Sequence, residues 1–175
     1  MTLDWRRVAL FLTAFSVMYL SLSAVWGQTV SHYVIDLATV KPAAWFACVV
    51  YGQSTIVPDG SHLRSPEATL NVLFGCEGLD LLMLLSAAIV CAPANWSFKL
   101  SGWFVACLFV WSCNQMRILS LYAALRAYPK WFGPLHGFLA PLGLVVLVAL
   151  YFLIWLRLSQ SAAGPRVPFT SSHAA

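Results

Sequence analysis

Long apolar runs separated by short polar segments dominate the chain. Each run has roughly the length of a helix that crosses a hydrocarbon core of about 30 Å, and the runs occupy residues 8–26, 75–92, 100–121 and 135–156. Pro93 follows the second run, and proline ends a helix because it lacks a backbone N–H. The pattern predicts an all-α integral membrane protein with about four transmembrane helices in a single membrane domain, residues 1–158.

Residues 29–51 are also apolar, but polar side chains interrupt them. His32, Asp36 and Lys41 lie within this stretch, and each is costly at the centre of a bilayer. Trp45 is an aromatic residue of the kind that anchors a helix at the membrane surface. We therefore expect residues 29–51 to form a helix that lies in the membrane interface.

The polar segments between and after the runs predict loops. Residues 54–74 contain Pro58-Asp59-Gly60 between two short β-prone stretches, which is turn chemistry and predicts a small extracytoplasmic hairpin or ordered loop. The aromatic content of residues 126–134 is typical of an interfacial loop. Residues 159–175 are small, polar and contain proline, so we expect a disordered tail.

Composition agrees with a location in the lipid bilayer. The chain of 175 residues is 61% hydrophobic and only 9% charged, and its mean hydropathy is +0.79. This leaves too little polar surface for a soluble globular protein. The net charge of +4 bears on topology, and we predict no nucleic-acid partner. Arg6 and Arg7 precede the first run, which places the N-terminus inside.

The cysteines show no metal-binding or disulfide pattern. The chain has five, with no Cys-x-x-Cys pair and no zinc-ligand spacing. We predict neither a disulfide framework nor a metal site, and no other cofactor. A membrane thiol oxidoreductase is one alternative function, and it would need Cys48 or Cys113 as a second reactive thiol on the outer side.

Cys76 stands out among the cysteines because of its neighbours. It lies between Gly75 and Gly78 at the start of an apolar run, with Asp80 one turn later. The glycines permit close helix packing and give a substrate backbone access to the sulfur. The positive end of a helix dipole would favour the thiolate form of the cysteine. Cys76 is therefore the candidate nucleophile of an enzyme.

Topology brings two further residues toward Cys76. Consecutive spans are antiparallel, so the start of the second, the end of the third and the start of the fourth lie on one face of the membrane. Cys76, Arg117 and His136 occupy these three places. With the N-terminus inside, that face is the outside.

The chemistry of these side chains fits nucleophilic catalysis. Arg117 would favour the thiolate and hold the oxyanion of a tetrahedral intermediate. His136 at the start of a helix would stay neutral, because the helix dipole disfavours imidazolium. It could then serve as general base and later return the proton to a leaving amine. Asn114 lies three residues before Arg117 and could orient either partner.

Asp80 leaves a second alternative open. An acid at membrane depth should be paired or neutral, and Arg117 is its candidate partner. An intramembrane ion pair of this kind would also fit a non-enzymatic assembly factor or a small transporter. Such a protein should tolerate Cys76→Ser.

Three motifs carry a resemblance to a known family. They are residues 75–78 (Gly-Cys-Glu-Gly), residues 114–118 (Asn-Gln-Met-Arg-Ile) and His136 before the last apolar run. Together they resemble the exosortase/archaeosortase family of membrane-embedded cysteine transpeptidases, over residues 54–156. The family core usually has more spans, so this chain looks like a short variant.

The resemblance implies a function and a location. The matching cysteine would be the nucleophile, with Arg117 and His136 as its partners. The substrates would be the C-terminal sorting signals of secreted proteins, each with a short motif, a transmembrane helix and a basic cluster. The enzyme would act at the outer face of the bacterial inner membrane and pass the cleaved protein to an acceptor nucleophile, which the sequence does not identify.

Overall fold

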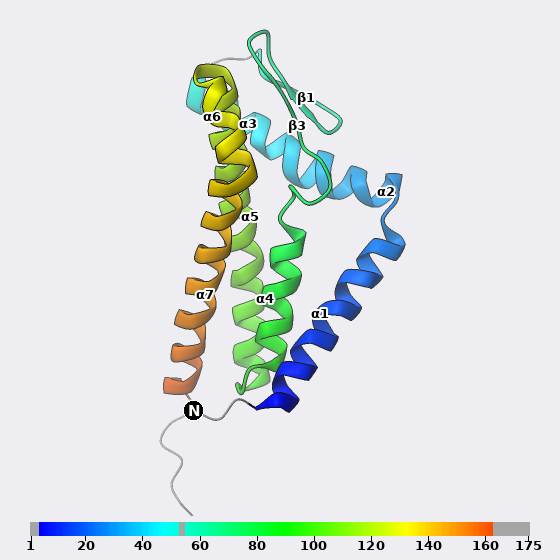
Figure 1. Cartoon of the computed structure of the whole chain (residues 1–175), viewed down its shortest axis with the longest axis vertical. Helices are drawn as coiled ribbons and strands as arrows, with labels where there is room; N and C mark the ends of the chain where they lie inside the picture. Colours follow the sequence, from blue (N-terminus) through cyan, green and yellow to red (C-terminus); the bar gives the residue numbers. More distant parts are fainter. Residues whose placement is uncertain (1–3, 53–54, 163–175) are drawn as a thin grey trace, which may run out of the picture.

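Helices make up most of the computed structural model, which describes residues 4–52 and 55–162 (Figure 1). Two of the segments, labelled η, are π-helical. In chain order the helices are α1 (Trp5–Val25), α2 (Gln28–Ser31), η1 (His32–Val40), α3 (Lys41–Tyr51), α4 (Leu79–Cys91), α5 (Trp96–Ala127), α6 (Pro129–Pro134), η2 (Leu135–Leu139) and α7 (Ala140–Ala162).

Within residues 4–52 and 55–162, four helical segments are long and apolar enough to cross a membrane. They are Trp5–Val25, Gln28–Tyr51, Trp96–Ala127 and Pro129–Ser161. The predicted span 75–92 is helical only over the 13 residues of α4, which at 1.5 Å per residue extends about 20 Å. The helix begins late because Gly75 and Gly78 have φ angles of 86° and 83°, a left-handed conformation that interrupts an α-helix.

The segment predicted as interfacial is a continuous helical stretch, α2–η1–α3. In Figure 1 it crosses the upper ends of α4 and α5, whereas α4, α5 and α7 run beside one another. His32 Nδ1 and Asp36 Oδ2 lie 2.8 Å apart, so two of the polar interruptions satisfy each other. Trp111 Nε1 on α5 donates to the Ala38 carbonyl at 2.8 Å. This bond attaches the crossing helix to the bundle.

The predicted hairpin is present and gains a third strand. Strands β1 (Val57–Asp59), β2 (His62–Arg64) and β3 (Thr69–Asn71) form an antiparallel sheet in the order β1-β2-β3. Leu63 and Leu70 are buried and belong to a core with residues of α3 and α5. The Tyr122 hydroxyl of α5 donates to Ser65 Oγ at 2.8 Å. The sheet is therefore fixed against the end of α5.

Two predicted non-helical segments differ from the structure. Residues 126–134 were expected to be a loop, but α5 continues to Ala127 and α6 begins at Pro129. The tail was expected to begin at residue 159, but α7 continues to Ala162, and the rest of the tail lies outside the described residues. In both places the added helical residues are mostly exposed, and the ends of an exposed helix carry little signal in the hydrophobic pattern.

Helices α4, α5 and α7 pack as a bundle, and the residues predicted to form the active site lie toward its upper end. Its core contains Leu85, Ile89, Ala106, Val110, Val148 and Trp155. Tyr151 Oη of α7 donates to the Gly102 carbonyl of α5 at 2.6 Å, and Trp103 Nε1 of α5 donates to Ser86 Oγ of α4 at 2.8 Å. These two hydrogen bonds fix how the three helices are aligned along their lengths. The alignment in turn positions the residues at the upper end of the bundle.

Candidate active site

Cys76, Arg117 and His136 line one small cavity. Its volume is about 10 Å³, and the other lining residues are Leu70, Asn71, Val72, Ile118 and Leu121. Arg117 Nη2 donates to Cys76 Sγ across 3.9 Å. The structure thus brings together the three residues that the topology predicts to converge. All three side chains are half-buried.

Cys76 lies in the turn before α4 and not within the helix. Its N–H donates to the Leu73 carbonyl at 2.9 Å, and the first turn of α4 begins at Leu79. The sequence placed the sulfur at a helix N-terminus, but the helix starts three residues later. The charged group that contacts the sulfur of Cys76 is the guanidinium of Arg117.

Gly78 packs directly against Asn114. A Cβ built on Gly78 would lie 3.3 Å from Asn114 Cγ, and Asn114 is only 1% exposed. Asn114 was expected to orient Arg117 or His136, yet its side-chain oxygen and nitrogen make no hydrogen bond in the described structure. Its observed role is to support the turn that carries Cys76. Gly75, by contrast, has open space around it, with Asp80 Oδ2 at 3.9 Å from a built Cβ.

Gly78→Ala is expected to destabilise the fold by about 1–3 kcal/mol, since a side chain at a φ of 83° is strained and the added methyl group would lie in tight contact with Asn114, 3.3 Å from its Cγ. The control is Gly143→Ala on α7, where a Cβ meets nothing within 4 Å and helix propensity improves. Thermal unfolding in detergent measures both variants. Equal stability of the two variants would contradict the tight packing of Gly78 on Asn114.

His136 lies inside a helix and not at its start. Helices α6, η2 and α7 follow one another without a break from Pro129 to Ala162, so the helix-dipole argument for a neutral His136 does not apply. Its ring stacks on Phe132, with centroids 5.4 Å apart and planes inclined by 3°. His136 Nδ1 is buried without a hydrogen-bond partner in the described structure. The residue belongs to a π-helical turn, a deformation frequently found at functional sites.

Buried polar atoms without a hydrogen-bond partner concentrate at this end of the molecule. Within the described residues, all such side-chain atoms belong to six residues, namely Glu77, Asp80, Asn114, Gln115, Arg117 and His136. Burying a polar group without a partner costs about 1–3 kcal/mol. An arrangement this costly is typical of a site that binds a polar ligand or water.

Glu77 is a residue of this cluster that the sequence reasoning did not single out, although it lies within the motif at residues 75–78. It is 8% exposed. Burial raises the pKa of its carboxyl above the ordinary value of 4.5, and the charge of Asp80 adds to the effect. Neighbouring backbone amides offset part of the increase in the pKa of Glu77, although none of them forms a hydrogen bond of good geometry with its carboxyl oxygens.

The raised pKa of Glu77 makes the free energy of unfolding depend on pH. Between the ordinary and the raised value the folded state holds a proton that the unfolded state has lost, so stability falls as pH rises above about 4.5. Glu77→Gln is expected to flatten this dependence, whereas Glu67→Gln, at an exposed ion pair with Arg126, should retain it. Unfolding midpoints across the acid and neutral range measure the difference. A wild-type slope in Glu77→Gln would contradict the assignment.

Asp80 and Arg117 do not form the ion pair that the sequence allowed. No nitrogen of Arg117 lies within 4.0 Å of a carboxylate of Asp80 or any other described acid. Asp80 Oδ1 and Arg117 Nε are both buried without partners. The charge of Arg117 is therefore not neutralised by a contacting acid, and its closest polar contact is the sulfur of Cys76.

No disulfide bond joins Cys76 to another cysteine. All five are free and half-buried, and Cys48 Sγ donates to the Ile56 carbonyl at 3.2 Å. The described residues also contain no group of three or more His, Cys, Asp or Glu side chains able to hold a metal ion. The polar chemistry at Cys76 comes from Arg117 and His136.

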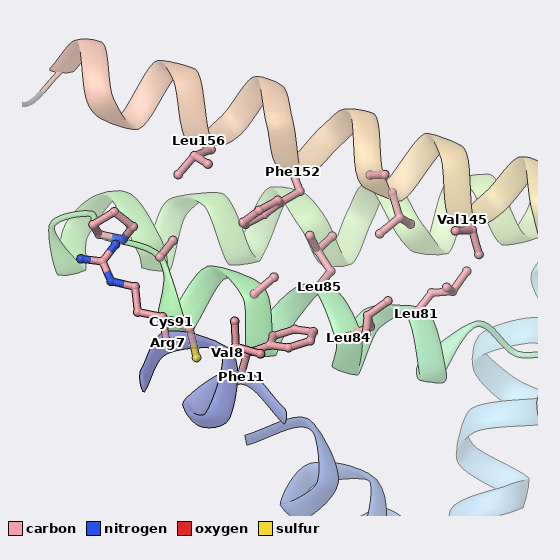
Figure 2. Close-up of a pocket in the computed structure, with 15 residues that line it drawn as sticks. Arg7, Val8, Phe11, Leu81, Leu84, Leu85, Cys91, Val145, Phe152 and Leu156 are labelled. Carbon is pink, nitrogen blue, oxygen red and sulfur yellow. The ribbon is translucent and has the colours of Figure 1, made fainter. Parts of the chain in front are cut away.

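A larger apolar groove lies along α4, between α1 and α7 (Figure 2). Its volume is about 490 Å³. Leu81 and Val145 lie at the end of the groove nearer the candidate site, and Arg7 and Leu156 lie at the opposite end. Leu81 directly follows Asp80 in the sequence, so the groove begins just below the polar cluster.

Three comparisons with known proteins identify no relative of this chain. A scan against protein-family models, a search of the curated proteins and a search of the solved structures find no match to this chain.

Proposed function

We propose that this chain is a membrane-embedded cysteine transpeptidase or endopeptidase that cleaves the C-terminal sorting signal of secreted, membrane-anchored proteins. The observation that carries the proposal is the 3.9 Å contact between Arg117 Nη2 and Cys76 Sγ, in a cavity that His136 also lines. A guanidinium that donates to the sulfur can stabilise the negative charge that develops there as the proton is removed.

The proposed reaction has two steps. His136 accepts the proton of Cys76, and the sulfur attacks the carbonyl carbon of the scissile peptide bond. Arg117 donates hydrogen bonds to the oxyanion of the tetrahedral intermediate. The C–N bond breaks, His136 returns the proton to the leaving amine, and a thioester remains on Cys76.

The second step releases the target protein. An acceptor nucleophile loses its proton to His136 and attacks the thioester carbonyl. The C–S bond breaks, and His136 returns the proton to the sulfur, which regenerates the thiol. Water as acceptor gives hydrolysis, and an amine or hydroxyl group gives transfer. The unpartnered polar atoms of Glu77, Asp80 and Asn114 support a polar ligand beside Cys76.

The surroundings of the site support a membrane-anchored target. The apolar groove between α1, α4 and α7 begins at Leu81, beside the polar cluster, and it offers a location for the hydrophobic segment of a sorting signal. We place the site at the outer face of a bacterial inner membrane, with the four long apolar helical segments as spans or interfacial helices.

The test is to express the chain with membrane-anchored proteins that share a C-terminal motif, helix and basic cluster. Mass spectrometry of the targets would show a C-terminus cut before the hydrophobic helix, and brief treatment with hydroxylamine would release a target bound to Cys76 as a thioester. Unaltered C-termini in every such target would contradict the proposal.

A further inference from the structure

Strand β3 has a free edge beside the candidate active site. The Val72 N–H donates to the Ser61 carbonyl at 2.8 Å, and the Ser65 N–H donates to the Ala68 carbonyl at 2.9 Å. These bonds fix the phase of the β2–β3 ladder. Backbone bonding directions alternate along a strand, so Thr69 and Asn71 direct their N–H and C=O groups away from β2. These groups have no protein hydrogen-bond partner in the part of the chain that the structure describes.

The opposite edge of the sheet is closed to a further strand. Val57 pairs with Arg64, and Asp59 pairs with His62. By the same alternation these pairs use the backbone groups of Val57 and Asp59, and Pro58 faces the outer edge of β1. Proline has no N–H to donate, a common means of blocking an edge strand. Of the two edges, only that of β3 therefore offers both donors and acceptors.

The open edge is continuous with the cavity of the candidate site. Leu70, Asn71 and Val72 line that cavity together with Cys76, Arg117 and His136. Thr69 and Asn71 are exposed, while Leu70 and Val72 are buried. After β3 the chain turns back through the bond from the Cys76 N–H to the Leu73 carbonyl. A strand that pairs with β3 would thus run toward the sulfur.

We infer that the free edge of β3 binds an extended segment of the target as a fourth strand and so delivers the scissile bond to Cys76. Each residue of a strand advances the chain by about 3.3 Å. Because Asn71 lines the cavity, the peptide bond of the target that follows the residue paired with Asn71 would reach the cavity. Main-chain hydrogen bonds supply the affinity, and alternate side chains of the peptide supply specificity. This inference deepens the proposed function and rests on it.

A peptide probe tests the inference without knowledge of the natural target. The full chain in lipid nanodiscs is treated with biotinyl-tetraalanyl chloromethyl ketone, whose chloride the Cys76 thiolate displaces as the S–C bond forms. In each of several versions of the probe, one backbone amide is N-methylated and so cannot donate a hydrogen bond. A peptide paired with β3 directs only alternate N–H groups toward that strand. Methylation of those N–H groups is expected to slow labelling of Cys76 by about tenfold, and methylation of the other N–H groups to have a much smaller effect.

Variants of β3 give a second, independent measurement. Asn71→Pro removes the outward N–H and leaves the ladder bonds to β2 in place, so labelling by the peptide probe should fall about tenfold. Iodoacetamide, which needs no strand pairing, should still label Cys76 at close to the native rate. Pro58→Ala changes only the far edge of the sheet, so it should behave as the native chain. If Asn71→Pro does not fold, the N-methylated probes on the native chain decide the matter.

The outcomes separate the inference from the proposed function. If N-methylation has no alternating effect while iodoacetamide modifies Cys76, strand addition is overturned and the nucleophile stands. If a second copy of the chain occupies β3, seen as concentration-dependent dimers that Asn71→Pro abolishes, strand addition of the peptide is likewise overturned. If neither reagent modifies Cys76, both proposals fall.

Discussion

Cys76→Ala is expected to abolish cleavage of sorting signals while the protein still folds. The sulfur of Cys76 forms the covalent intermediate of the proposed reaction, so we expect processing to fall by at least about 10³-fold, in line with removal of a catalytic nucleophile. The side chain is half-buried in a turn, and its truncation should cost little stability. Target processing by mass spectrometry and thermal unfolding in detergent measure the two effects.

Cys113→Ala is the matched control for this prediction. Cys113 is a free, half-buried cysteine on α5, one turn before Arg117, but it does not line the cavity. It should process targets at close to the native rate. Cys76→Ser should be nearly as inactive as Cys76→Ala, because a hydroxyl is far less readily ionised than a thiol. Normal processing by Cys76→Ala would exclude the enzymatic proposal, and equal loss in Cys113→Ala would show that the effect is structural.

The convergence of the site was predictable from the sequence, whereas its local geometry was not. The directions of successive helices follow from chain connectivity alone, so the sequence places Cys76, Arg117 and His136 at one end of the bundle. Whether His136 begins a helix depends on how α6 and η2 pack, and hydrophobic pattern does not contain that information. The same pattern did not separate the turn at residues 75–78 from α4, because isolated glycines are tolerated within helices.

The roles of buried polar side chains were the least predictable part. Asn114 shares a helix face with Arg117, yet it packs on Gly78, a contact set by the close approach of two segments far apart in the sequence. Glu77 reads as a surface charge at a helix start until its burial is known. The open edge of β3 likewise follows from the phase of backbone hydrogen bonds, which side-chain pattern does not determine.

Arg117→Lys is expected to lower kcat/KM for a cleaved target by about 10²–10³-fold, the cost of losing one oxyanion donor. Lysine retains a positive charge but not the planar fork of the guanidinium, which can contact both the sulfur and an oxyanion. Labelling of Cys76 by iodoacetamide should therefore decrease much less than catalysis in Arg117→Lys. Arg117→Gln loses the charge as well, so both labelling and catalysis should decrease strongly.

The matched control is Arg126→Lys on the same helix. Arg126 pairs with Glu67 and lies over the ring of Tyr51 at 5.1 Å, outside the cavity. The Arg126 side chain is 24% exposed and lysine retains its charge, so the replacement should leave both labelling and catalysis near native values. If Arg117→Lys were fully active, the oxyanion role of Arg117 would be excluded. If labelling survived unchanged in Arg117→Gln, the guanidinium would not be what makes Cys76 nucleophilic, and another group would have to supply the thiolate.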